Sequence, residues 1–155
     1  MCHVSDSIGE TPHLFTDFTF DNLGVPKNPK NPVYAYDPDF IDYGLGWFLL
    51  TRTDRPDYIS MAPVNMWKQK VPTLRNVDKR PGIGFTKAYM HNCVFKSLKE
   101  VVHFYNTRDV PGAKWPAPEV SENVNTVDLG NLGLTDGEEN AIVDFMKTLS
   151  DGYRK

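Results

Sequence analysis

Apolar residues between positions 98 and 105 recur with the period of an α-helix. Intervals of three and four residues separate them, which places them on one face of a helix. Ser97 precedes this run and Glu100 follows three residues later, a capping box that marks a helix N-terminus. We therefore predict a helix over this segment, with a buried stripe made of Leu98, Val101, Val102 and Tyr105.

A second helical pattern lies near the end of the sequence. Thr135 and Glu138 form another capping box, and Gly152 is a plausible stop signal. The spacing of the apolar residues between them predicts a helix whose buried face consists of Ala141, Ile142, Phe145, Met146 and Leu149.

The rest of the chain predicts mainly loops. Prolines and asparagines punctuate residues 10–35, within which 14–20 forms a short strand or a tight loop against the core. We expect another loop over 36–50, a short helix near 57–66 interrupted by Pro63, and a loop over 109–134. No linker divides the sequence. The prediction is therefore a single domain over residues 1–155, mostly α, loop-rich and with few helices.

Composition excludes several classes of function. The 155 residues carry 17 basic and 20 acidic side chains, a net charge of −3, and no basic cluster that would attract nucleic acid or an anionic membrane. The longest apolar stretch, 45–50, is far shorter than the roughly 20 residues that span a bilayer. The sequence does not open with a basic segment followed by an apolar one, so we see no signal peptide. Two cysteines do not make a disulfide framework.

The first chemical clue is the dipeptide Cys2-His3. Cys-His is the second half of the c-type haem attachment motif, in which two thiols bond the haem and the histidine binds its iron. The first cysteine of that motif would lie two residues before Met1. On its own, the dipeptide is weak evidence for haem.

Four longer phrases follow this pair in a recognisable order. Together they resemble the C-terminal haem domain of the bacterial di-haem cytochrome c peroxidase and MauG family, and the resemblance runs from Cys2 to about Leu149. Complete members carry a second, N-terminal haem domain, so the resemblance implies that this chain is the C-terminal half of a longer di-haem protein. The phrases are residues 14–26, 71–77, 88–92 and 95–105.

The resemblance implies a ligand set for haem c. Cys2 matches the second haem-bonding cysteine and His3 the proximal iron ligand. The distal ligand is methionine in the peroxidases and tyrosine in the MauG type, and its position is occupied here by Tyr105. A phenolate favours ferric iron and lowers the redox potential, so we expect a MauG-like iron environment. The alternative is a buried tyrosine whose hydroxyl hydrogen-bonds a carbonyl.

Further positions carry weaker implications. By resemblance, Arg75 pairs with a haem propionate and His91 lies between the two haem domains; the alternatives are a surface salt bridge and a structural histidine. Family members bind calcium through carbonyls that match Thr86 and Ala88. Because calcium requires about six oxygens, we expect no tight binding to this chain alone. Cys93 stands where the family has glycine, which predicts strained backbone and a buried free thiol.

The function implied is electron transfer that supports hydrogen peroxide reduction in the periplasm. In the family, a small redox protein supplies electrons and the N-terminal domain cleaves peroxide. With Tyr105 on the iron, this chain would pass electrons and would not itself cleave peroxide. The alternatives are an independent mono-haem electron-transfer module, or an inactive fragment of a longer di-haem enzyme.

Overall fold

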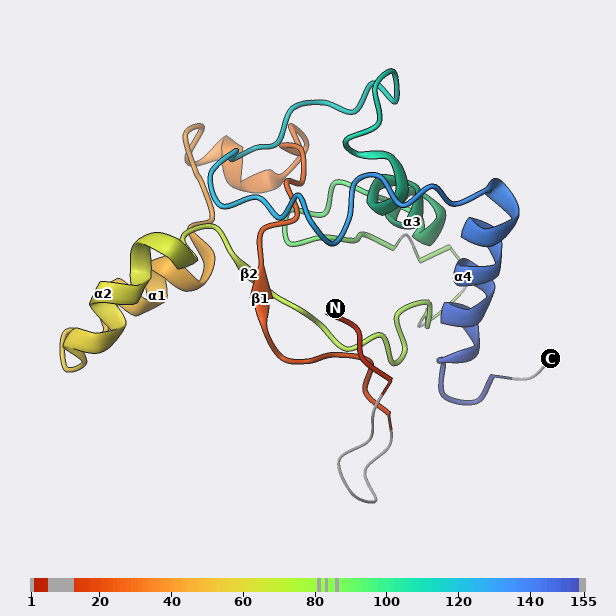
Figure 1. Ribbon diagram of the computed structural model, residues 1–155, viewed down its shortest axis with the longest axis horizontal. Coiled ribbons are helices and arrows are strands. Elements are labelled where there is room, and N and C mark those ends of the chain that lie inside the picture. Colours follow the sequence, from red (N-terminus) through yellow and green to blue (C-terminus); the bar gives the residue numbers. More distant parts are fainter. Residues whose placement is uncertain (1, 6–12, 81, 83, 86, 154–155) are drawn as a thin grey trace.

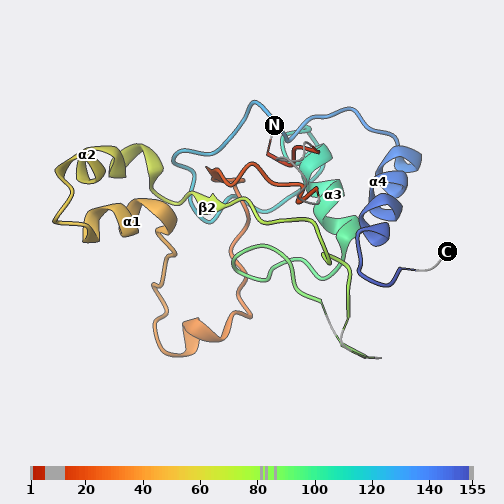
Figure 2. The same ribbon diagram turned by 90° about the horizontal axis from the view of Figure 1, so that it is seen from below.

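The computed structural model describes residues 2–5, 13–80, 82, 84–85 and 87–153. Within them, two pairs of packed helices lie at opposite ends of the molecule, with a two-stranded sheet and long irregular segments between them (Figures 1 and 2). The fold is thus mostly α and loop-rich, as predicted. The helices are α1 (Gly44–Thr51) packed on α2 (Pro56–Asn65), and α3 (Leu98–Thr107) packed on α4 (Asp136–Thr148), with a short 3-10 turn at Pro32–Ala35.

The sheet joins the two ends of the molecule. Strand β1 (Phe20–Asp21) pairs antiparallel with β2 (Gln69–Lys70), and Asp21 stands opposite Gln69. Strand β2 follows α2 directly in the chain, while β1 follows the segment that begins with the Cys-His pair. No helix in the described part of the chain is long and apolar enough to cross a membrane.

Both capping boxes are confirmed. The Ser97 hydroxyl accepts the Glu100 backbone N–H at 3.1 Å, and the Glu100 carboxylate accepts the Ser97 N–H at 2.9 Å. The same reciprocal pair links Thr135 and Glu138 at the start of α4. Each box satisfies amides that the helix itself leaves free, so these two boundaries follow from local sequence.

The predicted buried face of α4 is partly wrong. Met146 and Leu149 are buried, but Ile142 and Phe145 are 38% and 48% exposed, and Ala141 is also exposed. The most buried residue of the helix is Glu139, which lies two turns before Met146 and therefore on the same face. Among the helices and strands, α4 packs mainly on α3, so its buried stripe is narrower than its apolar pattern.

The expectation of a loop over 36–50 is also wrong, because α1 lies within it. This helix has no side-chain cap at its N-terminus, and the Leu45 N–H instead donates to the Lys68 carbonyl at 2.9 Å. A Cβ on Gly46 would overlap the Met66 backbone, so glycine permits close approach to the end of α2. Helix α1 is therefore held by tertiary contacts that leave no local signal. Helix α2 lies where expected and continues through Pro63.

Helix α3 is the centre of the core. One face contributes Phe104 to a cluster with Val25, Phe95 and Leu129. Another face contributes Leu98 and Val102 to a cluster with Met146 of α4. Two apolar clusters on different faces fix α3 between the irregular segments and α4, and Tyr105 lies at the edge of the first cluster.

Candidate functional site

The N-terminal Cys-His pair is bound to the segment that precedes β1. The Cys2 carbonyl accepts the Asp17 N–H at 3.0 Å. The His3 ring donates from Nδ1 to the Phe15 carbonyl at 2.8 Å. Since a carbonyl can only accept, this bond places the proton on Nδ1 and leaves the lone pair of Nε2 free. A histidine that binds a metal is typically held in this way.

Tyr105 of α3 lies close to Cys2, although the two residues stand near opposite ends of the sequence. Burial raises the pKa of the Tyr105 phenol, and the charges of Cys2 and Asp21 raise it further. Tyr105 is therefore a neutral phenol at neutral pH unless a positive charge is placed beside it. The described residues offer its hydroxyl no hydrogen-bond partner, so the carbonyl bond expected of a structural tyrosine is not observed.

Asp21 is a member of this site that the sequence did not suggest. Its Oδ2 accepts the Cys2 thiol at 3.9 Å and the Asn125 amide at 2.6 Å. Burial raises the pKa of the Cys2 thiol, and the charge of Asp21 raises it further, so the sulfur is protonated at neutral pH. No local sequence pattern indicates this contact, because β1 brings Asp21 to a thiol that lies 19 residues away in the sequence.

Hydrogen bonds from a neighbouring loop hold the backbone around Tyr105. The Tyr105 carbonyl accepts the Gly130 N–H at 2.7 Å, and the Asn106 carbonyl accepts the Leu132 N–H at 3.0 Å. Gly130 has a φ of +104°, and a Cβ there would overlap the Asp109 side chain. This glycine therefore permits a loop that satisfies the last carbonyls of α3.

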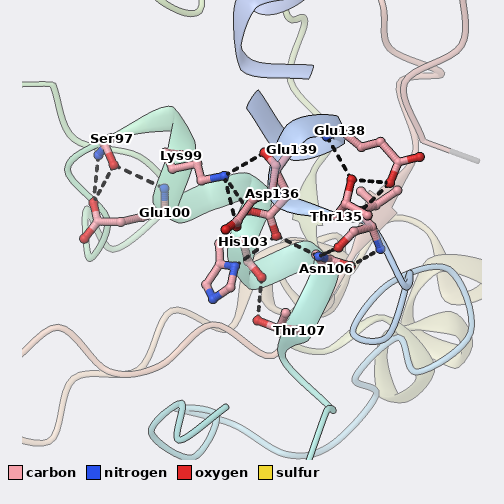
Figure 3. A network of polar contacts seen from close by, with 11 residues as sticks. Ser97, Lys99, Glu100, His103, Asn106, Thr107, Thr135, Asp136, Glu138 and Glu139 are labelled. Atoms are coloured by element: carbon pink, nitrogen blue, oxygen red, sulfur yellow. Dashed lines mark hydrogen bonds and ion pairs between the residues drawn. The ribbon is translucent and has the colours of Figure 1, made fainter. Parts of the chain in front are cut away.

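A buried carboxylate anchors the other side of α3 (Figure 3). Glu139 of α4 is 1% exposed. Its Oε2 forms an ion pair with Lys99 at 2.7 Å, and its Oε1 accepts from Nδ1 of His103 at 2.9 Å and from the Asn106 amide at 2.7 Å. Burial alone would raise the pKa of Glu139, but the bonds from Lys99, Asn106 and His103 outweigh burial and lower it to about 2.

The sequence did not predict this network. The apolar pattern placed only apolar residues on the buried face of α4, and no role was predicted for His103. A signal was nevertheless present. The three donors stand at i, i+4 and i+7 of α3 and form a polar stripe beside its apolar one. A polar stripe on an otherwise buried helix requires a polar partner, and an acidic residue on the adjacent helix supplies it.

The weaker candidates lie elsewhere. Arg75 forms an ion pair with Asp151 at 3.3 Å, the arrangement of the surface salt-bridge alternative. Nε2 of His91 stands 3.9 Å from the Glu119 carboxylate; burial lowers the pKa of His91, against the charges of Asp42 and Glu119. Ala88 is exposed, and Thr86 lies outside the described residues. No group of three or more His, Cys, Asp or Glu side chains in the described chain is arranged to hold a metal ion.

Cys93 confirms one prediction and corrects another. Its φ of +60° lies in the left-handed region, which accounts for a glycine at this position in the family. The residue is exposed, however, so the expectation of a buried thiol is wrong. The turn brings Cys93 to the surface because its N–H closes a tight bond to the Met90 carbonyl at 3.1 Å.

Comparison with known proteins finds relatives that match almost the whole chain. The chain is 34% identical over 164 residues to the methylamine utilization protein MauG of Paracoccus denitrificans, with 97% of this chain and 38% of that protein covered. It is 32% identical over 143 residues to the cytochrome-c peroxidase IdrP2 of Denitromonas iodatirespirans, covering 88% of this chain and 34% of that protein. No family model matches the chain.

A solved structure also matches almost the whole chain. It is that of a variant of the diheme peroxidase BthA from Burkholderia thailandensis, with a TM-score of 0.76 and 28% identity, covering 97% of this chain and 38% of that one. The chain thus spans a little over a third of the length of the proteins it matches.

Proposed function

This chain belongs to the di-haem cytochrome c peroxidase and MauG family, and on that premise we propose that it is a haem domain that passes electrons in support of hydrogen peroxide reduction. The observation that carries the proposal is that a histidine with a free Nε2 and a tyrosine with an unbonded hydroxyl both lie next to Cys2. A nitrogen base and a phenol are both established axial ligands of haem iron.

The residues of the site fit haem c. The protonated Cys2 thiol would add its S–H across one haem vinyl group and form a thioether. His3 would bind the iron through Nε2, and its bond to the Phe15 carbonyl would fix the ring. Tyr105 would supply a phenolate oxygen as a further ligand of the iron. When bound, haem supplies the iron that accepts and releases the electron.

The protein environment favours the ferric state. A phenolate is a hard, anionic ligand, and Asp21 adds a second negative charge near Tyr105. Binding as phenolate requires that the ferric charge lower a pKa that burial raises, so Tyr105 releases its proton only when iron is present. With His3 and Tyr105 both holding the iron, these residues would leave peroxide no place to bind it. The chain's own role is therefore electron transfer, with peroxide cleavage in an N-terminal haem domain.

The remaining parts of the proposal rest on the family alone. They are a periplasmic location, which covalent haem implies, and a small redox protein as the electron donor. To contact a haem propionate, as the resemblance implies, Arg75 would have to leave Asp151 or to bind both carboxylates at once. By the resemblance, the carbonyls of Thr86 and Ala88 would supply two of the roughly six oxygens that calcium requires, so most of its ligands would come from the second domain.

Replacing Tyr105 tests the proposal directly. In the full chain with haem bound, we expect a phenolate-to-iron charge-transfer band in the ferric state, and Tyr105→Phe should abolish it. Tyr89→Phe is the matched control, since that half-buried tyrosine donates its hydroxyl to the Val77 carbonyl at 3.4 Å. Tyr105→Met should raise the midpoint potential, because a soft thioether favours ferrous iron. An unchanged ferric spectrum in Tyr105→Phe would refute the assignment.

A further inference from the structure

We propose that Glu139 is the positioning residue that sets the rotation of α3 and thereby aims Tyr105 at the haem iron. The inference rests on the proposed role of Tyr105 as an iron ligand. Glu139 does not touch the site itself. It acts through α3, which carries both its three partners and Tyr105.

The geometry of the donors makes the carboxylate a directional clamp. Lys99, His103 and Asn106 extend over eight residues of α3, a rise of about 10 Å at 1.5 Å per step. All three reach one carboxylate on α4. A rotation or a shift of α3 would lengthen at least one of these contacts. Together they fix both the rotation of α3 about its axis and its position along that axis.

The apolar clusters on α3 do not provide this precision. Dispersion and burial are non-directional, and the contacts of Leu98, Val102 and Phe104 tolerate small rotations. A side-chain atom about 6 Å from the helix axis moves about 1 Å when the helix turns by roughly 10°. Metal-ligand distances in proteins tolerate only about 0.2 Å. A phenol aimed at iron therefore needs a firmer angular constraint than the core supplies.

The position of Tyr105 makes it sensitive to this clamp. It lies between His103 and Asn106 in sequence, so two of the three donors flank it within a single turn. Asn106 is itself held from a second direction, because its side chain donates to the Leu134 carbonyl and accepts the Leu134 N–H, both at 2.9 Å. The contact with Glu139 and the two contacts with Leu134 thus all act on Asn106, the residue that follows Tyr105.

A buried ionic group at this position is not required for stability as such. An apolar residue of similar volume often stabilises a core as well as a buried ion pair does, and buried charges can instead contribute a unique geometry. A methionine at position 139 would occupy a similar volume without the charge. We therefore attribute the fully buried glutamate and its three partners to the orientation of α3.

The test compares variants of the full chain with haem bound, by the ferric charge-transfer band, the midpoint potential and the thermal unfolding midpoint. Glu139→Gln removes the charge at constant shape, and Glu139→Met removes the polarity. We expect both to weaken the band at least twofold at a temperature far below unfolding, with a higher potential, and Glu139→Asp to recover part of the band. If neither folds, Lys99→Met removes one donor from a half-exposed site, with the same expectation at smaller size.

A matched control separates orientation from stability. Leu49 is buried in α1, at the other end of the molecule, so Leu49→Ala should lower the unfolding midpoint without changing the band. If the Glu139 and Lys99 variants unfold at lower temperature but keep the full band and potential, Glu139 is merely structural and the inference is wrong. If the unaltered chain has no such band, the proposed role of Tyr105 fails, and this inference fails with it.

Discussion

Protonation of Glu139 should account for a measurable part of the acid sensitivity of this fold. Its pKa falls from an ordinary value of 4.5 to about 2 in the folded chain. A carboxyl whose pKa is lower when folded stabilises the fold at pH values above its unfolded pKa. This contribution is lost as the pH falls through the window from 4.5 to about 2. Because each tenfold change in affinity is 1.36 kcal/mol, the full contribution is roughly 3 kcal/mol.

The assay is urea unfolding of the unaltered chain and of Glu139→Gln, each at about pH 5 and about pH 3. Over that interval the linkage relation removes roughly 2 kcal/mol of the Glu139 contribution. The charged groups facing Glu139 are Lys99 and His103, with Asp136 a further partner of Lys99.

The difference between the two proteins is the informative quantity. Other carboxyls with lowered pKa, among them Asp54 and Asp109, titrate in both chains and cancel. We expect the stability advantage of the unaltered chain over Glu139→Gln to shrink by roughly 2 kcal/mol from about pH 5 to about pH 3. An advantage of the same size at both pH values would show that Glu139 does not titrate as its contacts require, and would refute the reasoning.

Two further predictions concern backbone geometry. Gly130→Ala should lower the free energy of unfolding by roughly 1–2 kcal/mol or more, because its φ is +104° and the new Cβ would overlap Asp109. Gly133→Ala is its control in urea unfolding, since that glycine has a φ of +70° and open space at the Cβ position, so equal losses would exclude the overlap. Cys93→Gly should raise the free energy of unfolding by roughly 0.5–1 kcal/mol, because it relieves a φ of +60° at an exposed turn. A thermal midpoint below that of the unaltered chain would contradict this.

The sequence predicted those features whose cause is local. The capping boxes at Ser97 and Thr135 act over three residues, and both helix starts were correct. The apolar stripe ending in Tyr105 was sufficient to turn that side chain inward. The strained backbone at Cys93 followed from comparison with a family glycine at one position.

Features set by distant partners were not predictable in this way. Helix α1 begins with a bond to the Lys68 carbonyl, and no pattern within α1 encodes that partner. The apolar spacing of α4 gave Ile142 and Phe145 as buried, whereas the surface that α3 offers accepts Glu139 instead. The same holds for Asp21, which reaches Cys2 only because β1 pairs with β2.

The two proposed iron ligands are attached to very different supports. Tyr105 belongs to a helix held by two apolar clusters and a buried carboxylate. His3 belongs to an irregular segment that is secured by single hydrogen bonds, one from the His3 ring to the Phe15 carbonyl and one from the Asp17 N–H to the Cys2 carbonyl. Segments with few buried contacts open at lower free energy than the packed core of the same protein. Reversible loss of the iron ligands should therefore begin with His3. A covalent tether at Cys2 would keep the released histidine within reach of the iron.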